Sequence, residues 1–550
     1  MAGLTRAQVR NLLAVQGFSP PEPDLTEVVL RINALTEGLM TLEDLDVFQV
    51  EPWTNLPYRG LPERRLSDPP APKPAAPHTD NVAFMTIAEQ AALIESKKLS
   101  PVELVRLYLE RIDRYDNRLF AFNLVMREEA LAAAKQAEDE IAAGKYRGPL
   151  HGIPIGLKDQ FDIKGQPNTG GCDAYIDNIA AEDCTIVARL REAGAVIIGT
   201  LATHEFHMGG TLEFLRKETP RNPWDLSRTP AGSSAGSGSS VAAGLLSGSI
   251  GGDTGGSIRG PGSVNGIAGL RPSWSRLSRQ GAFALSWELD TAGPLARSAE
   301  DTAIMLQVIA GYDPKERTTS REPVPDYAAA LTGKISDLKI GVFSELMDQI
   351  EDKDTRVLIE NAIDVLRGMG ASVETVSIPL ATKMTGVQSA ISDGYAASYH
   401  RAGLRQKYDL YDTNTRIRIM TGMIIPTGLQ TLARRAKAAL GEAVLDAFED
   451  FDVLVGATGS GPAGPIVTQS PVKDLKTARV AISARGGASG ALSNAGAAAI
   501  SIPAGFTSKG LPVGWQIATR PMDEATLFRV CHAYQLVTDH HQKHPPMDWA

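Results

Sequence analysis

The chain has 550 residues, 43% hydrophobic and 22% charged, which are the proportions of an ordinary soluble globular protein with a sizeable core. Its net charge of −9 offers no general attraction for nucleic acid, and no apolar run reaches the roughly 18 residues of a membrane span, so we expect neither a nucleic-acid nor a membrane partner. Three widely spaced cysteines argue against a disulfide framework or a zinc site and predict a cytoplasmic protein.

Residues 1–60 have the pattern of short helices. Thr5 and Gln8 form a predicted capping box, a second helix is expected over 25–35, and leucines 39, 42 and 45 indicate a third. Because so few helical residues bury little surface alone, we expect this extension to pack on the main body or on another subunit. Residues 61–83 follow as a proline-rich linker, and the catalytic domain is predicted to span 84–550.

Beyond the linker, short apolar strands alternate with helices. Thr86 with Glu89 and Ser100 with Glu103 predict two capped helix starts. Further helices are expected over 128–143, 185–193 and 354–369, and strands over 151–157, 195–198, 248–251, 338–343, 372–376, 451–455 and 499–502. This alternation predicts an α/β fold with a sheet covered on both faces.

A glycine–serine block from Pro230 to Gly269 carries only two charges, Asp253 and Arg259. Such a composition is typical of a flexible linker. However, the apolar run at 241–246 lies inside the block, and patterned sequence flanks it on both sides. We therefore favour a folded site in which glycines permit close backbone approach and serines supply hydroxyls.

Two serines of this block are candidate nucleophiles. The segment 232–236 matches G-x-S-x-G, but the strand that a nucleophile elbow requires does not precede it. Ser257 follows a predicted strand and two glycines, whose N–H groups can converge on an oxyanion. The tripeptide alone also fits a tight turn with a capping serine.

Lys158 ends an apolar predicted strand. Such a lysine is usually at the surface. If it is buried, desolvation lowers its pKa and lets the neutral amine act as a base, and serine–lysine variants of the catalytic triad use such an amine.

Seven segments in order resemble the motifs of the amidase signature family over about residues 84 to 545. They are Gly152-Ile-Pro-Ile-Gly-Leu-Lys158-Asp159, Glu205-Phe206, Asn222-Pro-Trp-Asp225, Gly232-Ser-Ser-Ala-Gly-Ser237, Gly252-Asp-Thr-Gly-Gly-Ser-Ile-Arg259, Gly293-Pro-Leu-Ala-Arg-Ser298 and Gly510-Leu-Pro-Val-Gly-Trp-Gln516. The resemblance implies an α/β/α sandwich with a mixed central sheet, plus the small N-terminal helical extension. It also implies a catalytic triad in which Ser257 is the nucleophile, Ser233, after a cis peptide bond, is the bridging serine, and Lys158 is the base. The implied oxyanion hole is the backbone N–H groups of Thr254, Gly255, Gly256 and Ser257.

The family resemblance implies a cofactor-independent hydrolase of small-molecule carboxylic amides that forms a serine acyl-enzyme, with aryl amides, esters or carbamates as further substrates. No metal site is expected, because His204 and His207 have the wrong spacing for one helix face. The sequence departs from the family's usual motifs near Gly260, Thr200 and Thr458. The substrate of any one family member is therefore not transferred to this chain. The alternatives are an amidotransferase A-type subunit that supplies ammonia to a tRNA-amidating partner, and a non-enzymatic binding protein. The N-terminal helices resemble extensions that help some bacterial amidases to form dimers, and this resemblance implies a homodimer.

Overall fold

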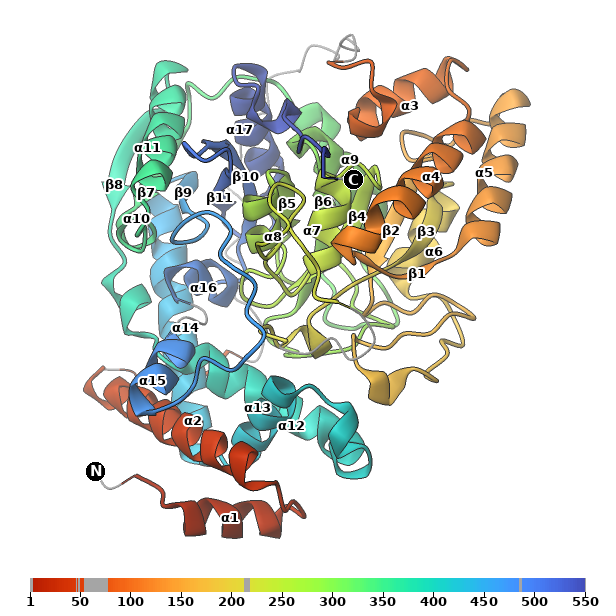
Figure 1. The fold of residues 1–550 in the computed structure, drawn as a ribbon. Helices are drawn as coiled ribbons and strands as arrows, with labels where there is room; N and C mark the ends of the chain where they lie inside the picture. The colour runs from red at the N-terminus through yellow and green to blue at the C-terminus, as the bar shows by residue number, and fades with distance from the viewer. Residues whose placement is uncertain are drawn as a thin grey trace.

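The computed structural model describes residues 3–45, 47, 50–53, 78–211, 218–483 and 487–549. Its described strands form one mixed 11-stranded sheet in the order β1-β3-β2-β4-β6-β5-β10-β11-β9-β7-β8 (Figure 1). The strands are β1 Phe122–Val125, β2 Pro154–Lys158, β3 Val196–Leu201, β4 Gly248–Asp253, β5 Ala268–Arg271, β6 Thr291–Ala296, β7 Lys339–Phe343, β8 Ser372–Val376, β9 Val453–Ala457, β10 Ala498–Phe506 and β11 Pro512–Thr519.

Helices cover both sides of this sheet (Figure 1). The described α-helices are α1 Arg6–Val15, α2 Glu22–Met40, α3 Ile87–Glu95, α4 Pro101–Leu119, α5 Arg127–Ala142, α6 Thr185–Glu192, α7 Ala235–Ala242, α8 Arg259–Asn265, α9 Ala299–Ile309, α10 Ser344–Asp348, α11 Lys353–Gly368, α12 Val387–Gln406, α13 Thr413–Met423, α14 Thr427–Asp450, α15 Leu475–Ser483, α16 Gly487–Asn494 and α17 Glu524–Leu536. Within the described ranges, no helix has the length and apolar character needed to cross a membrane. The predicted fold class, a mixed sheet between helical layers, is confirmed.

Strand β2 lies inside the sheet and ends at Lys158. It pairs in parallel with β3 on one side and with β4 on the other, and all five of its residues are buried. The following segment and the carboxyl end of β4 therefore emerge at the same edge of the sheet, which brings Lys158 close to the loop after Asp253.

Helix α7 explains the glycine–serine composition of residues 230–269. All of its residues are buried. A Cβ atom on Gly236 would lie 2.2 Å from the carbonyl oxygen of Ala121, and one on Gly238 would lie 2.7 Å from the side-chain amide nitrogen of Asn265. Larger residues do not fit at these positions, so the block is a closely packed element of the core. The prediction that this block is folded, and is not a flexible linker, is confirmed.

The N-terminal helices pack on the body of the same chain. Arg31 of α2 donates to the side chain of Asn414 at 2.9 Å, and Asp24 accepts from Arg416 at 2.6 Å. Apolar residues of α1 and α2 join those of α12, α13 and α14, and a few from the sheet, in one core cluster that is separate from the larger cluster around the other strands. The extension is thus part of a second core, beside α13 and α15 at the bottom of Figure 1.

Most predicted elements are present within a few residues of their expected bounds, and the capping boxes at Thr5, Thr86 and Ser100 are confirmed. The prediction of a separate third N-terminal helix is wrong. Because only Gly38 interrupts the pattern, α2 continues to Met40 and ends in a 3-10 turn, Thr41–Asp44. Most of the predicted linker, residues 61–77, lies outside the described residues, and the division into three segments stays a prediction.

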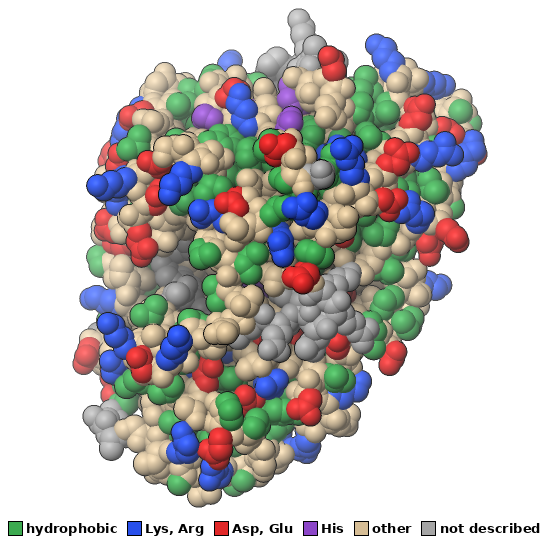
Figure 2. Space-filling model, in the orientation of Figure 1, with side chains coloured by type: hydrophobic (Ala, Val, Ile, Leu, Met, Phe, Trp, Pro, Cys, Tyr) green, Lys and Arg blue, Asp and Glu red, His purple; other side chains and the backbone are tan. Residues whose placement is uncertain are grey.

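Charges of both signs are interspersed over the face of the molecule shown in Figure 2, without a continuous patch of one sign. This distribution agrees with the modest net charge of the sequence.

Candidate active site

Lys158 is completely buried, as its proposed role as a base requires. Its Nζ donates to the Ser233 hydroxyl at 2.7 Å and to the Gly252 carbonyl oxygen at 3.4 Å. Burial lowers the pKa of the Lys158 amine to about 7, against the opposing influence of the carboxylates of Asp253 and Asp290. A substantial fraction of this amine is therefore neutral at physiological pH and able to take a proton.

Ser233 lies immediately before α7 and is completely buried. The Gly232–Ser233 peptide bond is cis. The ring of His204 packs on Gly232 so closely that a Cβ atom there would lie 2.6 Å from it. The carbonyl oxygen of Ser233 accepts from the backbone N–H of His204 at 3.1 Å. His204 therefore contacts both residues of the cis peptide bond.

Ser234 joins the segment of Ser233 to the segment of Ser257. Its hydroxyl donates to the carbonyl oxygen of Gly252 and accepts from the N–H of the same residue, both at 3.2 Å. Its backbone N–H donates to the Ser257 carbonyl oxygen at 3.3 Å. Lys158 and Ser233, 75 positions apart in sequence, are therefore in hydrogen-bond contact, and the backbone of Ser257, 24 positions further on, is held beside them through Ser234. The Ser257 hydroxyl itself makes no hydrogen bond to Ser233 in this structure.

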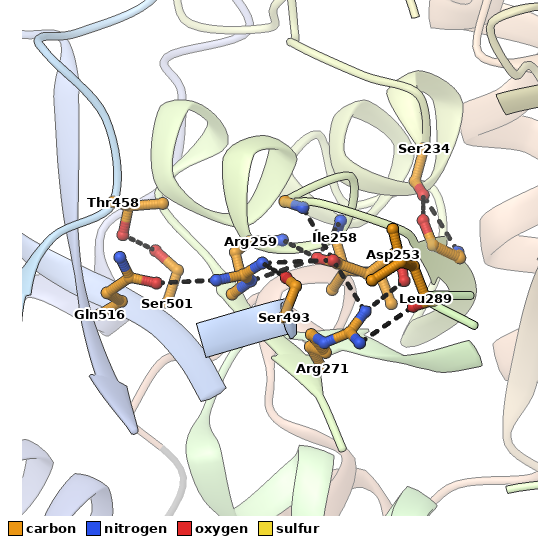
Figure 3. Close-up of polar contacts among 12 residues, drawn as sticks. Ser234, Asp253, Ile258, Arg259, Arg271, Leu289, Thr458, Ser493, Ser501 and Gln516 are labelled. Atoms are coloured by element: carbon orange, nitrogen blue, oxygen red, sulfur yellow. Dashed lines mark hydrogen bonds and ion pairs between the residues drawn. The ribbon is translucent and has the colours of Figure 1, made fainter. Parts of the chain in front are cut away.

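Asp253 holds the loop that carries Ser257. One carboxylate oxygen accepts from the Gly256 N–H at 2.7 Å, and the other accepts from the Ile258 N–H at 3.1 Å. The carboxylate also forms ion pairs with Arg259 at 3.3 Å and Arg271 at 3.2 Å (Figure 3). Burial alone would raise the pKa of the Asp253 carboxyl, but the two guanidinium groups hold this pKa well below its usual range. The loop is thus fixed by a buried, ionised carboxylate.

The C-terminal part of the chain contributes to this network. Arg259 donates to the Gln516 side-chain oxygen at 2.9 Å and to the Ser493 hydroxyl at 2.7 Å, as Figure 3 shows. Gln516 in turn donates to the carbonyl oxygen of Ala457 at 2.9 Å. Strands β11 and β9 therefore help to fix the position of the Ser257 loop.

The structure distinguishes among the four backbone donors predicted for the oxyanion hole. The Gly256 N–H donates to Asp253, and Gly256 adopts a φ of +124°, which favours glycine. Among the described residues, the N–H groups of Thr254, Gly255 and Ser257 donate to no protein acceptor. These three are the N–H groups available to a bound oxyanion in this conformation.

Ser257 is half-buried and lines a cavity of about 770 Å³, a size typical of small-molecule sites. Gly232, Gly255 and Gly256 form the adjoining floor. The rest of the lining comes from α10, the turn that follows it and segments near 382 and 459. A substrate in this cavity therefore reaches the Ser257 hydroxyl.

The histidines near the motifs do not have the environment of a general base. Burial and the nearby Lys158 charge lower the pKa of His204 to about 4. His151 lies before the other end of β2, where it contacts Glu140 at 3.2 Å. The G-x-S-x-G elbow is also absent in its usual form, because the described residues before Ser233 form turns and no strand.

Sequence reasoning left three residues of the site without a role: Asp253, Arg271 and Ser234. One signal was available for Asp253, since it and Arg259 are the only charges in forty residues and a buried charge requires a partner. No comparable signal marks Arg271 or Ser234, because their contacts depend on the pairing of distant segments.

Comparison with known proteins assigns the family. A family model described as Amidase matches residues 103–528. The A-type subunit of the glutamyl-tRNA(Gln) amidotransferase of Geobacillus stearothermophilus is 36% identical over 490 residues, 84% of this chain and 98% of that protein. An amidase of Pseudomonas putida is 34% identical over 472 residues, with coverage of 84% and 98%. The structure of the peptide amidase of Stenotrophomonas maltophilia superimposes with a TM-score of 0.70 and 28% identity, covering 84% and 98% of the two chains.

The fold, the site and these matches define an enzyme of the amidase class. The chain belongs to the amidase signature family.

Proposed function

We propose that the protein hydrolyses carboxylic amides through an acyl-enzyme on Ser257. The observation that carries the proposal is the buried Lys158 amine, with a pKa of about 7, at 2.7 Å from the Ser233 hydroxyl. A neutral amine in that position takes a proton from Ser233, and Ser233 takes one from Ser257. No histidine is needed for this relay.

The reaction proceeds in two halves. The Ser257 oxygen attacks the substrate carbonyl carbon, and the oxyanion is bound by the N–H groups of Thr254, Gly255 and Ser257. The C–N bond then breaks as the leaving nitrogen receives the relayed proton, which gives a free amine and an ester on Ser257. Water attacks that ester, the relay takes its proton and returns one to Ser257, and the carboxylic acid leaves. Aryl amides, esters and carbamates acylate the Ser257 hydroxyl by the same steps.

Trapping of the intermediate tests this proposal. Mixing the protein with a 4-nitrophenyl ester should give a burst of 4-nitrophenol and an intact-mass increase equal to one acyl group. Peptide mapping should place the added mass on Ser257. The Ser233→Ala protein should show a much slower burst, because the proton relay is broken. Acylation of another residue, or turnover without any acylated species, would contradict the assignment.

A second candidate is an amidotransferase A-type subunit, favoured by the name of the relative from Geobacillus stearothermophilus. In that case ammonia from glutamine is passed to a partner protein. The N-terminal extension, which shares a core with α12–α14, and the altered segment 456–461 argue against it. Ammonia release from glutamine that appears only with a partner protein would favour this candidate over an independent amidase.

We also propose that the protein is a cytoplasmic homodimer, which the free, buried thiols of its three cysteines and two exposed apolar side chains of α1 support. Leu12 is 41% exposed and Val15 is 83% exposed. The full chain should sediment as a dimer and the Leu12→Glu/Val15→Glu protein as a monomer. Val357→Glu, at a 55% exposed valine of α11, is the control. A dimer that survives the α1 substitutions would contradict this role of the extension.

A further inference from the structure

The cavity above Ser257 has an acidic wall. Glu345 and Asp348 of α10 and Glu351 of the following turn line it. None of the three carboxylates lies within 4 Å of a cationic side chain among the described residues. Arg259 is the one cation among the described residues that line the cavity, and it is ion-paired with Asp253, a carboxylate that it shares with Arg271. The space that a substrate occupies is therefore negative on the α10 side.

Glu345 is the unusual member of this wall, because it is only 8% exposed. Its carboxylate accepts from the Ser377 hydroxyl at 2.6 Å, the Ile378 N–H at 3.0 Å and the Ser344 hydroxyl at 3.0 Å. Burial raises the pKa of the Glu345 carboxyl, but the hydrogen bonds lower it below its usual value. Among these bonds, the one from Ser377 has the largest effect and the one from Ile378 the next. The group is thus a nearly buried negative charge without a countercharge among the described residues, and such charges are normally paired.

The three carboxylates do not form a metal site. Within the part of the chain that the structure describes, no three histidine, cysteine or acidic side chains converge closely enough to hold a metal ion. They act instead as separate charges spread along one wall, an arrangement that suits an extended organic cation.

We propose that this cavity takes amides that carry a cationic nitrogen, an ammonium or guanidinium group, on the part of the substrate that lies against α10. The scissile carbonyl then lies at Ser257, which lines the same cavity. This inference rests on the proposed function, since it names the substrate class of the same site. Glu345, Asp348 and Glu351 are its specificity-determining residues.

Two pairs of substrates of equal length test the inference. On the acyl side, 6-aminohexanoyl 4-nitroanilide is compared with heptanoyl 4-nitroanilide. On the amine side, N-(4-aminobutyl)benzamide is compared with N-pentylbenzamide. In at least one pair, the ammonium compound should have a kcat/KM about tenfold or more above that of its neutral partner at low salt. The ratio of the two kcat/KM values should fall as the salt concentration rises. Equal kcat/KM values in both pairs would overturn the inference.

Substitutions test whether the acidic wall causes the preference for the ammonium compound. The Asp348→Asn/Glu351→Gln protein changes two exposed residues, so its folding is not at risk, and Glu345→Gln adds the buried one. The ratio of kcat/KM should fall several-fold in the double variant and to within about twofold in the triple variant. Glu360→Gln, an exposed acid of α11 outside the cavity lining, should leave the ratio unchanged. A ratio that persists in the double variant would overturn the inference.

Calorimetric titration separates this inference from the proposed function. The Ser257→Ala protein is titrated with both members of each pair, so that binding is measured without turnover. Preferential binding of the ammonium compound, with no hydrolysis of either compound by the wild-type protein, would support the cationic site and contradict the proposed function. Hydrolysis of both compounds without preferential binding would support the function and overturn the inference.

Discussion

The Ser257→Ala protein should hydrolyse amides at least about 10⁴-fold more slowly than the wild-type protein, since the acyl-enzyme cannot form. Its thermal unfolding temperature should stay close to the wild-type value, because Ser257 is half-buried and its hydroxyl makes no hydrogen bond among the described residues. Initial rates on an aryl amide and a thermal melt of the same preparation measure the two effects.

Ser237→Ala is the matched control. It makes the same chemical change in the same glycine–serine block, at a buried hydroxyl that has no hydrogen-bond partner among the described residues. Its rate should remain near that of the wild-type protein. A Ser257→Ala protein that keeps a comparable rate would remove Ser257 as the nucleophile.

Replacing Lys158 by methionine should abolish activity and at the same time stabilise the fold. In the wild-type protein, kcat/KM should fall as pH falls through about 7, since the amine then gains a proton and ceases to be a base. The Lys158→Met protein should lack turnover across this range. Wild-type rates in the variant at pH 7, or a flat wild-type profile from pH 5.5 to pH 8, would remove Lys158 as the base.

The stability effect follows from the same pKa. Between about pH 7 and the usual lysine value of 10.5, the unfolded chain binds a proton at Lys158 that the folded chain does not. The wild-type free energy of unfolding should therefore rise with pH in that window, and at pH 7 the buried lysine lowers it by about 4 kcal/mol. Methionine removes this cost but loses the hydrogen bond to Ser233, so we expect a net gain of about 2–3 kcal/mol in chemical denaturation at pH 7.

Local sequence signals predicted β2, β3, β4, β7, β8, β9 and β10, the helices capped at Thr5, Thr86 and Ser100, and the fold class, because hydrophobic periodicity and capping depend on neighbouring residues. The strands β1, β5, β6 and β11 were not predicted. The same signals gave no prediction for α12, α13 and α14. Helix α12, for example, buries polar residues such as Asp393 and His400, which obscures an apolar stripe. The end of α2 was also misplaced, since the helix continues through Gly38 to Met40.

The site could be predicted only in part. The motif around Ser257 and the apolar strand before Lys158 indicated which residue types carry the chemistry. The burial of Lys158, however, depends on strands on both of its sides, and the ion pair of Arg271 with Asp253 joins segments 18 residues apart through the sheet. The acidic wall at Glu345 lies nearly ninety positions from Ser257, and no periodicity connects the two.

The hydrogen bonds of Arg259 to Ser493 and Gln516 have a consequence for biosynthesis. A ribosome completes the Ser257 loop long before it makes residues 493–516, so the nascent chain contains the proposed nucleophile without the partners that fix its loop. If Ser257 is the nucleophile, we therefore expect hydrolytic activity only when synthesis is nearly finished, and none in a prematurely terminated polypeptide.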